Sequence, residues 1–534
     1  NLIERNNKMK KLSILSLAAG MLALASCDSY LDKLPDDRAE VNSLDKAKKF
    51  LVSAYPNHSP NFVFFISGDN VSDNGVLYNA QPNQMNAYKW EPIETEGNDD
   101  PKQVWNANYE AVAVANMALE ALAGEESADA QALRAEALLC RAFAMFQNAN
   151  MFCMAWNDSK ADEYLGIPYP KVAGESVNER GTLRQTYENI NADIEEALPL
   201  LNDGYLTVPK YHFNQKAAYA FAARFNLFYQ NWDKAIEYAT KALGGNPSSL
   251  MRDMDSYAPL AGVADIHNKW IRSGENCNLM FVDAVSINGR VNRGSSSYKR
   301  FCHNMDVLKS QTMWAKTPWS DVSSSAAKNA LQEARLMYGS DQAVYMPSLI
   351  EDFEIKDKIN QTGYAHVVDP VFTGDETILT RAEAYIMKKE YDKALADMNT
   401  WLTAHSDVTS PKFLTLTVDN VNTALNAIRM TEVPSRAVSE ESIKKPLNPQ
   451  GFTVEEGTQT NMIYTVLQMR RITTIYQGQR WLDIKRWGIE FTHHLDGEDN
   501  LVFKAGDLRG AIQLPYDVIE AGLEPNPRET ATQN

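Results

Sequence analysis

Side chains that could perform catalysis or bind a metal are few and scattered. Residues 69–75 (DNVSDNG) resemble a calcium-binding loop. An EF-hand, however, needs an oxygen ligand at its third position and a glycine at its sixth, where this segment has Val71 and Asn74. We therefore interpret it as a polar loop and predict no metal site and no cofactor, with calcium at this loop as an open alternative.

The adjacent histidines His493 and His494 offer two imidazole groups. Neighbouring side chains in a strand or a helix point apart, so we expect a solvated pair rather than a joint catalytic site. The sequence contains no HExxH, GxSxG, P-loop or GxGxxG motif. A pair of glycosidase carboxylates leaves no such motif because their separation is spatial, and an unrecognised hydrolase therefore stays open as an alternative.

The strongest chemical signal is Cys27, which follows the small residues Ala25 and Ser26. Lysines precede an uncharged run from Leu12 to Ala25, and this run is shorter than the ~20 apolar residues that a membrane-spanning helix needs. The pattern predicts a secretory signal peptide over residues 1–26, with Met9 as its start and residues 1–8 upstream. Its end resembles a bacterial lipobox, in which a diacylglycerol alkylates the thiol. We therefore predict lipidation at Cys27 and a lipidated tether over 27–45.

Composition describes a globular body behind this tether. The chain is 44% hydrophobic and 23% charged, which is typical of a folded protein. Its net charge of −17 argues against nucleic acid as a partner, because phosphate binding relies on Lys and Arg. Four further cysteines are too few for a disulfide scaffold. The sequence leaves open whether two of them, Cys277 and Cys302, pair.

Helical patterns occupy residues 104–243 and 375–404. Two similar segments, 231–236 (NWDKAI) and 390–395 (EYDKAL), each follow a helix rich in alanine and aromatic residues. An aromatic residue marks the corner, and an Asp enters the first turn of the next helix, where it favours the positive end of the helix dipole. The pattern is similar to a tetratricopeptide (TPR) unit, although any antiparallel helix hairpin would use similar residues. We predict TPR-like helix pairs scattered within one fold.

Two segments are loop-rich. Residues 244–370 carry many Trp and Tyr residues among Gly, Ser, Asn and Pro, and residues 407–457 contain four prolines. Long stretches with little regular structure are more often functional than incidental, so we look for a binding surface in the aromatic segment.

The C-terminal region carries a family resemblance. Arg470-Arg471 precedes residues 478–487 (GQRWLDIKRW), and the chain closes with 514–520 (LPYDVIE) and Asn526-Pro527. Together with CDSYLD after the lipobox, this text resembles the signature of SusD/RagB surface lipoproteins. The resemblance covers residues 46–534 as one SusD-like domain, with the signature in 461–534. One departure is Gln477, where a glutamate is usual.

The signature block itself has a structural interpretation. Arg480 and Arg486, with Asp483 between them, can form charge-assisted hydrogen bonds that lock a helix against the body. Trp481 and Trp487 supply a large buried area at the same junction. We expect substitutions in this block to lower stability before they affect binding.

The resemblance implies a mostly α, SusD-like fold and a lipid-anchored protein on the outer-membrane surface of Bacteroidota cells. Family members cap a SusC-like, TonB-dependent transporter and capture oligosaccharides or, in some branches, peptides; they bind rather than catalyse. It therefore implies a glycan or peptide ligand, a SusC-like partner and no catalytic residue. The alternatives are a surface-anchored glycoside hydrolase and a peptide-binding lipoprotein.

Sugar rings lie against aromatic planes, and their hydroxyls need polar side chains at the rim. On that basis the candidate ligand-binding residues are Trp314, Trp319, Trp90, Asp73 and Asn74. Each tryptophan could instead be part of the core.

Overall fold

The computed structural model describes residues 44–294, 298–323 and 328–528, and these are mostly helical. The predicted signal peptide and Cys27 lie outside the described residues. The helices are α2 (Leu44–Leu51), α3 (Asn61–Ser67), α4 (Pro82–Lys89), α5 (Pro101–Ala121), α6 (Ala128–Phe152), α7 (Leu183–Ala197), α8 (Gln215–Phe228), α9 (Trp232–Leu243), α10 (Val263–Trp270), α11 (Asn288–Asn292), α12 (Met305–Gln311), α13 (Gly374–Met387), α14 (Tyr391–Ala404), α15 (Val418–Ala427), α16 (Thr458–Thr473), α17 (Gln479–Trp487) and α18 (Tyr516–Glu520).

Short antiparallel sheets complete the fold. The largest has the strand order β2–β7–β6, with β7 in the centre. The strands are β1 (Ser72–Asp73), β2 (Asn278–Val285), β3 (Phe301–Cys302), β4 (Tyr338–Ser340), β5 (Ala343–Tyr345), β6 (Asp352–Asp357), β7 (Thr362–Thr373), β8 (Phe491–His493) and β9 (Leu501–Phe503).

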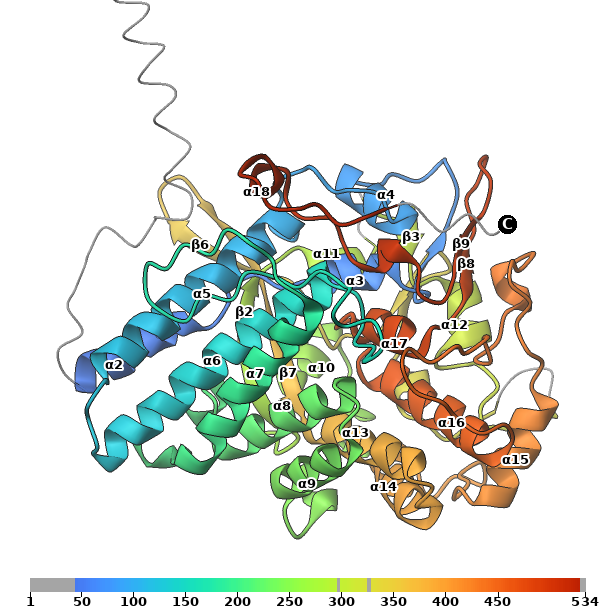
Figure 1. The fold of residues 1–534 in the computed structure, drawn as a ribbon. Coiled ribbons are helices and arrows are strands. Elements are labelled where there is room, and N and C mark those ends of the chain that lie inside the picture. The colour runs from blue at the N-terminus through green and yellow to red at the C-terminus, as the bar shows by residue number, and fades with distance from the viewer. Residues whose placement is uncertain (1–43, 295–297, 324–327, 529–534) are drawn as a thin grey trace, which may run out of the picture.

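The predicted TPR-like pairs join into one array in space. Helices α5, α6, α7 and α8 lie side by side across one half of the molecule, and α9 packs on α8 (Figure 1). Helix α13 then packs on α9, and α14 packs on α13. The pair α8 and α9 and the pair α13 and α14 are therefore in contact, although more than a hundred residues separate them in the sequence. Alanine-rich interiors permit such close helix crossings.

The two similar corners share one geometry. Two positions before each second helix, Gln230 (φ 63°) and Lys389 (φ 61°) have a left-handed conformation although neither is glycine. In the first corner the side chain of Asn231 accepts a hydrogen bond from the backbone N–H of Lys234 and caps α9, as polar residues at helix N-termini do. The sequence similarity of the two segments therefore reflects a real structural repeat.

The loop-rich segment 244–370 contains more regular structure than its composition suggests. Both β2 and β6 lie within it, and β7 begins in it. Strand β2 reads as a nearly continuous apolar run because most of its residues are buried, so it lacks the alternation that marks a half-exposed strand. The sheet backs the helices and brings β7 close to α8 and α13.

Two further expectations can be compared with the structure. Cys140, Cys153, Cys277 and Cys302 are all free thiols, so the possible pairing of Cys277 with Cys302 does not occur here. Within the described ranges, no helix combines the length and the apolar character needed to cross a membrane.

Candidate functional site

Helices α16 and α17 carry the signature residues and hold them inside the molecule. The carboxylate of Asp69 accepts two hydrogen bonds of 2.8 Å from Arg480, and Lys445 donates to the same carboxylate at 2.8 Å. Arg471 lies 3.2 Å from it. Burial alone would raise the pKa of Asp69, but its three cationic partners hold this pKa well below the ordinary value. Asp69 is thus a buried anion at the centre of a hub.

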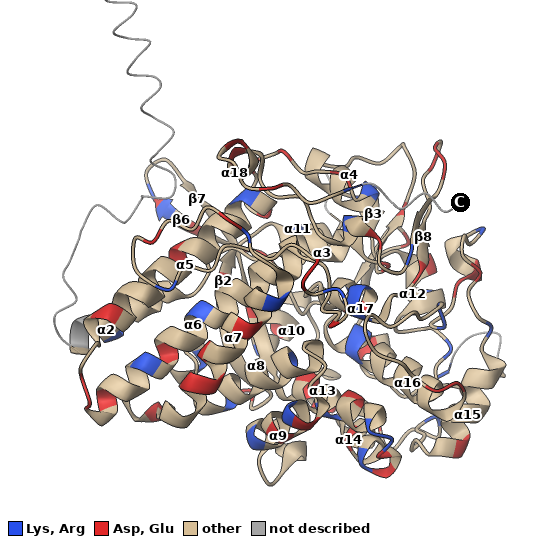
Figure 2. Cartoon of the chain, in the orientation of Figure 1, with Lys and Arg blue, Asp and Glu red and all other residues tan. Residues whose placement is uncertain are grey.

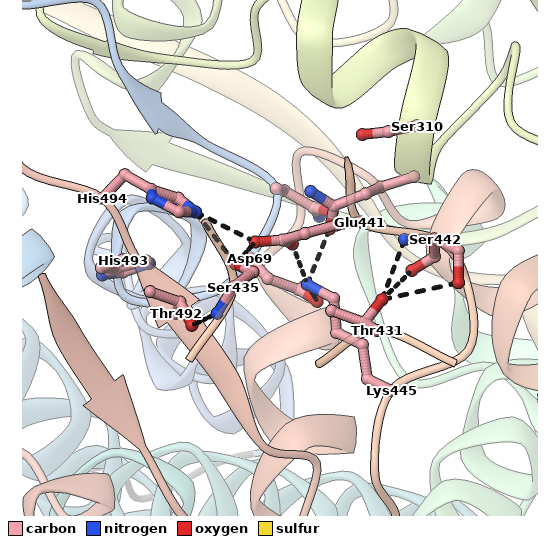
Figure 3. A network of polar contacts seen from close by, with 12 residues as sticks. Asp69, Ser310, Thr431, Ser435, Glu441, Ser442, Lys445, Thr492, His493 and His494 are labelled. Atoms are coloured by element: carbon pink, nitrogen blue, oxygen red, sulfur yellow. Dashed lines mark hydrogen bonds and ion pairs between the residues drawn. The ribbon is translucent and has the colours of Figure 1, made fainter. Parts of the chain in front are cut away.

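The hub continues through Lys445 to a second buried carboxylate (Figure 3). Lys445 lies 2.9 Å from Glu441, and Glu441 accepts a hydrogen bond of 2.6 Å from Ser435. Burial opposes ionisation, yet Lys445 and its other partners lower the pKa of Glu441 to about 2. His494 joins this group, with its Nε2 atom 3.0 Å from Ser435 Oγ and 3.3 Å from Glu441.

Ser435, His494 and Glu441 do not form a catalytic triad. In a triad the carboxylate binds one imidazole nitrogen and the hydroxyl group binds the other. Here both Ser435 and Glu441 face the same Nε2 atom of His494, and Ser435 donates directly to the carboxylate. Ser435 is also buried. The arrangement fixes the loop 431–445 against β8 rather than exposing a nucleophile.

His493 corrects the expectation of a solvated histidine pair. Its side chain is buried and stacks between Tyr88, with ring centroids 3.8 Å apart, and Trp90, at 4.6 Å. Burial lowers its pKa to about 4. The two histidines do point apart, as strand geometry requires, but the first enters the core because β8 is covered by α4.

A second buried charge cluster ties α17 to α13. Arg486 donates to Glu383 at 2.7 Å and to Asp483 at 2.9 Å, and the indole of Trp487 donates to Glu383 at 3.1 Å. The structural interpretation of the signature block is confirmed for this pair. Arg480 differs from the expectation because its partner is Asp69 rather than Asp483.

The predicted ligand-binding tryptophans separate into two groups. Trp90 (1% exposed) and Trp319 (2%) are buried, whereas Trp314 is 36% exposed. Trp90 donates from its indole to the carbonyl of Ser67 at 2.9 Å, and Trp319 packs edge-on against Trp401. Neither buried indole offers a free face to a ligand. Trp314 does, with its indole N–H held by the carbonyl of Ala334 at 2.9 Å.

The polar candidates Asp73 and Asn74 are engaged within the chain. Asp73 accepts two hydrogen bonds of 3.0 Å from Arg300. Asn74 donates to the carbonyls of Lys299 and Gln342 at 2.6 and 2.7 Å. These contacts anchor β1 beside β3 and hold both side chains against neighbouring segments of the chain.

A cavity of about 50 Å³ opens where α3, α6 and α8 meet β7 and the start of α17. At its base is Asp369, which is 4% exposed. Its carboxylate accepts from the side-chain amides of Asn61 at 2.7 Å and Gln477 at 2.6 Å. Burial raises the pKa of Asp369, more than these amides and the nearby guanidinium of Arg224 lower it.

Gly478 lies between two residues of the cavity lining, Gln477 and Gln479. It has φ +70°, and a Cβ atom there would lie 2.5 Å from the Cβ of Phe64. Only glycine combines that conformation with so close an approach to α3. The glycine of the signature therefore sets where α17 begins and holds Gln477 and Gln479 at the cavity.

Sequence reasoning missed this cavity. Asp369 lies 308 positions from Asn61 and 108 from Gln477, and none of the three belongs to a recognisable catalytic pattern. The one available signal was the departure at Gln477. A glutamate there would place a second carboxylate against Asp369, whereas the amide donates to it.

Other kinds of site are not evident in the described parts of the chain. No group of three or more His, Cys, Asp or Glu residues is arranged to hold a metal ion there. Figure 2 shows acidic and basic residues interspersed along the outer helices, whereas the basic residues of α17 lie in the middle of the molecule.

Sequence comparison points to one family. Residues 29–227 match the SusD-like family model described as starch-binding and associating with the outer membrane. No curated protein matches the chain.

Solved structures resemble nearly the whole fold. A SusD superfamily protein from Bacteroides thetaiotaomicron gives a TM-score of 0.62 at 16% identity, over 91% of this chain and 100% of that chain. A putative sugar binding protein from Bacteroides vulgatus gives 0.60 at 16% identity, over 92% and 99%. A SusD superfamily protein from Bacteroides fragilis gives 0.58 at 16% identity, over 90% and 98%. At this identity the likeness establishes a shared fold.

Proposed function

We propose that the chain, whose residues 29–227 match the SusD-like family model, is a carbohydrate-binding protein of that family associated with the outer membrane. The observation that carries this proposal is the match of residues 29–227 to a family described as starch-binding and associating with the outer membrane. The putative sugar binding protein among the similar structures supports it. The ligand is an oligosaccharide or a related nutrient oligomer.

The more specific part of the proposal is that the protein is anchored through a lipid at Cys27 and delivers its ligand to a SusC-like, TonB-dependent transporter. The small residues before Cys27 and the family resemblance motivate this part. We expect the native protein to co-purify with a barrel transporter in mild detergent. Recovery without a barrel protein in comparable yield would contradict the partnership, and a Cys27→Ser form that stays with membranes in unchanged amount would contradict the anchor.

The binding surface proposed for the oligosaccharide includes Trp314. Its indole is the one exposed face among the three predicted tryptophans, and its N–H is already oriented by Ala334, so the ring plane is fixed for stacking. A stacked aromatic pair contributes ~0.5–1.5 kcal/mol beyond its area. We therefore expect Trp314→Ala to weaken the binding of the best oligosaccharide about tenfold.

The experiment begins with a glycan array on the form lacking residues 1–27, followed by calorimetric titration of the best ligand. Tyr516→Ala serves as the matched control, because Tyr516 is an exposed aromatic residue (61%) on α18. Unchanged affinity in Trp314→Ala would exclude this surface. Hydrolysis products in the assay would favour the glycoside hydrolase alternative, and binding of peptides alone would favour the peptide-binding one.

A further inference from the structure

The cavity at Asp369 has the composition of a ligand site. Apolar rings of Phe64 and Phe146 and the side chain of Leu482 form one part of its lining. Side-chain amides form the other part, together with the carboxyl group of Asp369. Small-molecule sites combine such apolar walls with a few convergent polar groups.

One polar group in the lining lacks a partner. The Oε1 atom of Gln479 is buried and accepts no hydrogen bond from the described residues. An unsatisfied buried acceptor costs free energy, so a rotation of the Gln479 amide that lets it accept from a bound hydroxyl would be favourable. Gln147, half-buried on α6, adds a second amide to the same wall.

The charges in the cavity select against an ion. Arg224 is held in a two-point ion pair with Glu376, at 3.1 Å for both hydrogen bonds. Asp369 accepts hydrogen bonds from two side-chain amides. An anion would be repelled by the carboxyl group of Asp369. A cation would have only this one acidic group as a partner, and both of its oxygens already accept hydrogen bonds. A neutral ligand that both donates and accepts fits best.

The size of the cavity limits how much of a ligand enters. A buried water needs roughly 10–15 Å³ of such space, so about 50 Å³ accommodates a few water-sized groups. That is the size of two or three adjacent CH–OH units, and not of a whole sugar ring.

We propose that this cavity binds a neutral polyol, namely the hydroxyl-bearing edge of a single sugar residue or a free molecule the size of glycerol. The C–H groups of the ligand would lie against Phe64 and Phe146, and its hydroxyls would bond Gln479, Gln147 and Asp369. The site is separate from Trp314 and rests on the cavity's own groups rather than on the proposed function.

The test uses D-glucose, D-galactose and glycerol, each titrated against the protein and followed by saturation-transfer NMR. Gln479→Met and Gln147→Met remove one amide each while keeping side-chain length. The matched control is Gln131→Met, because Gln131 is also a half-buried glutamine of α6 but lies outside the cavity. Melting temperatures of all variants show that they remain folded.

We expect at least one probe to bind, with affinity about two- to tenfold weaker in Gln479→Met and Gln147→Met and unchanged in Gln131→Met. Preference for a monosaccharide or for glycerol identifies the source of the polyol. Absence of binding by all three probes, or binding that neither cavity variant weakens, would overturn the proposal. Binding of the probe retained in Trp314→Ala distinguishes this site from the oligosaccharide surface, so either proposal can fail without the other.

Discussion

Two buried aspartates on neighbouring elements show how partners decide the role of a carboxyl group. Asp69 faces two arginines and a lysine, and its pKa is held far below the ordinary value. Asp369 accepts hydrogen bonds from amides, and burial raises its pKa. Both carboxyl groups are more than nine-tenths buried, so the difference comes from the partners and not from the depth.

The comparison separates scaffold from site. In the hub of Asp69, each charge faces an opposite charge of the same protein, which rigidifies the junction of α3, α16 and α17. The Nη1 atom of Arg471 is buried there without a hydrogen-bond partner among the described residues. At Asp369 hydrogen-bonding capacity is left over, and a neighbouring acceptor on Gln479 lacks a partner. The two groups therefore differ in their partners: the hub joins opposite charges of one protein, whereas the carboxyl group of Asp369 accepts from neutral amides and lines a cavity.

The largest expected effect comes from breaking the hub. Asp69→Ala leaves Arg480, Arg471 and Lys445 buried without their shared anion, and removing one member of a buried ion pair typically costs ~3–5 kcal/mol. We expect the free energy of unfolding, measured by denaturant titration, to fall by about that amount. Asp369→Ala is the comparison, with a loss of ~1–3 kcal/mol for unpaired amide donors. Equal losses would contradict the distinction between the two aspartates.

The buried cluster of His405, Glu333 and Asp375 allows the same comparison to be tested by the pH dependence of stability. His405 contacts Glu333 and lies 3.0 Å from Asp375. Burial alone would lower its pKa, but these two carboxylates raise it to about 9. A raised folded-state pKa means that the stabilisation is complete below about pH 6.5 and disappears as the pH rises through about 9.

We therefore expect the difference in the free energy of unfolding between wild type and His405→Gln to be largest at pH 6. Between pH 6 and pH 10 this difference should fall by about 3 kcal/mol. Thermal unfolding across this pH range measures the difference, and subtraction of the two curves removes the contributions of other titrating groups. A difference that does not change with pH would show that folding does not raise the pKa of His405.

The exchange Gln477→Glu installs the residue that is usual at this place in the SusD/RagB signature, which the sequence resembles. It removes the hydrogen bonds to Asp369 and to the carbonyl of Pro370, at 2.6 and 3.0 Å, and brings two carboxyl groups together. We expect a loss of ~1–3 kcal/mol at pH 7 that becomes smaller in acid, where one carboxyl group is protonated. Gln477→Glu combined with Asp369→Asn should recover part of this loss, and failure to recover it would show that the two positions are not coupled.

The smallest effect on stability is expected for Trp314→Ala, because its ring is the exposed one. We expect a change within ~0.5 kcal/mol, as for most surface positions. Trp319→Ala is the buried counterpart and should cost ~3–5 kcal/mol. A collapsed melting temperature in Trp314→Ala would place this tryptophan with the core.

The sequence by itself determined the local structure. Helix periodicity depends on neighbours within a few positions, and it indicated the helical region 104–243, which holds α5 to α9, and the repeated corner at Asn231 and Glu390. The charged and aromatic composition of residues 480–487 likewise indicated a buried junction. Strand β2 within 244–370 was not predicted because a buried strand has no alternating pattern of apolar and polar residues.

Only the tertiary structure decided which side chains are exposed and which meet. Trp90, Trp314 and Trp319 look alike in sequence, but the packing of β8 against α4 and of Trp401 against Trp319 buries two of them. The cavity likewise depends on Asn61 and Asp369, which are 308 positions apart. Burial and leftover hydrogen-bonding capacity are properties of contacts between distant segments, and no local pattern encodes them.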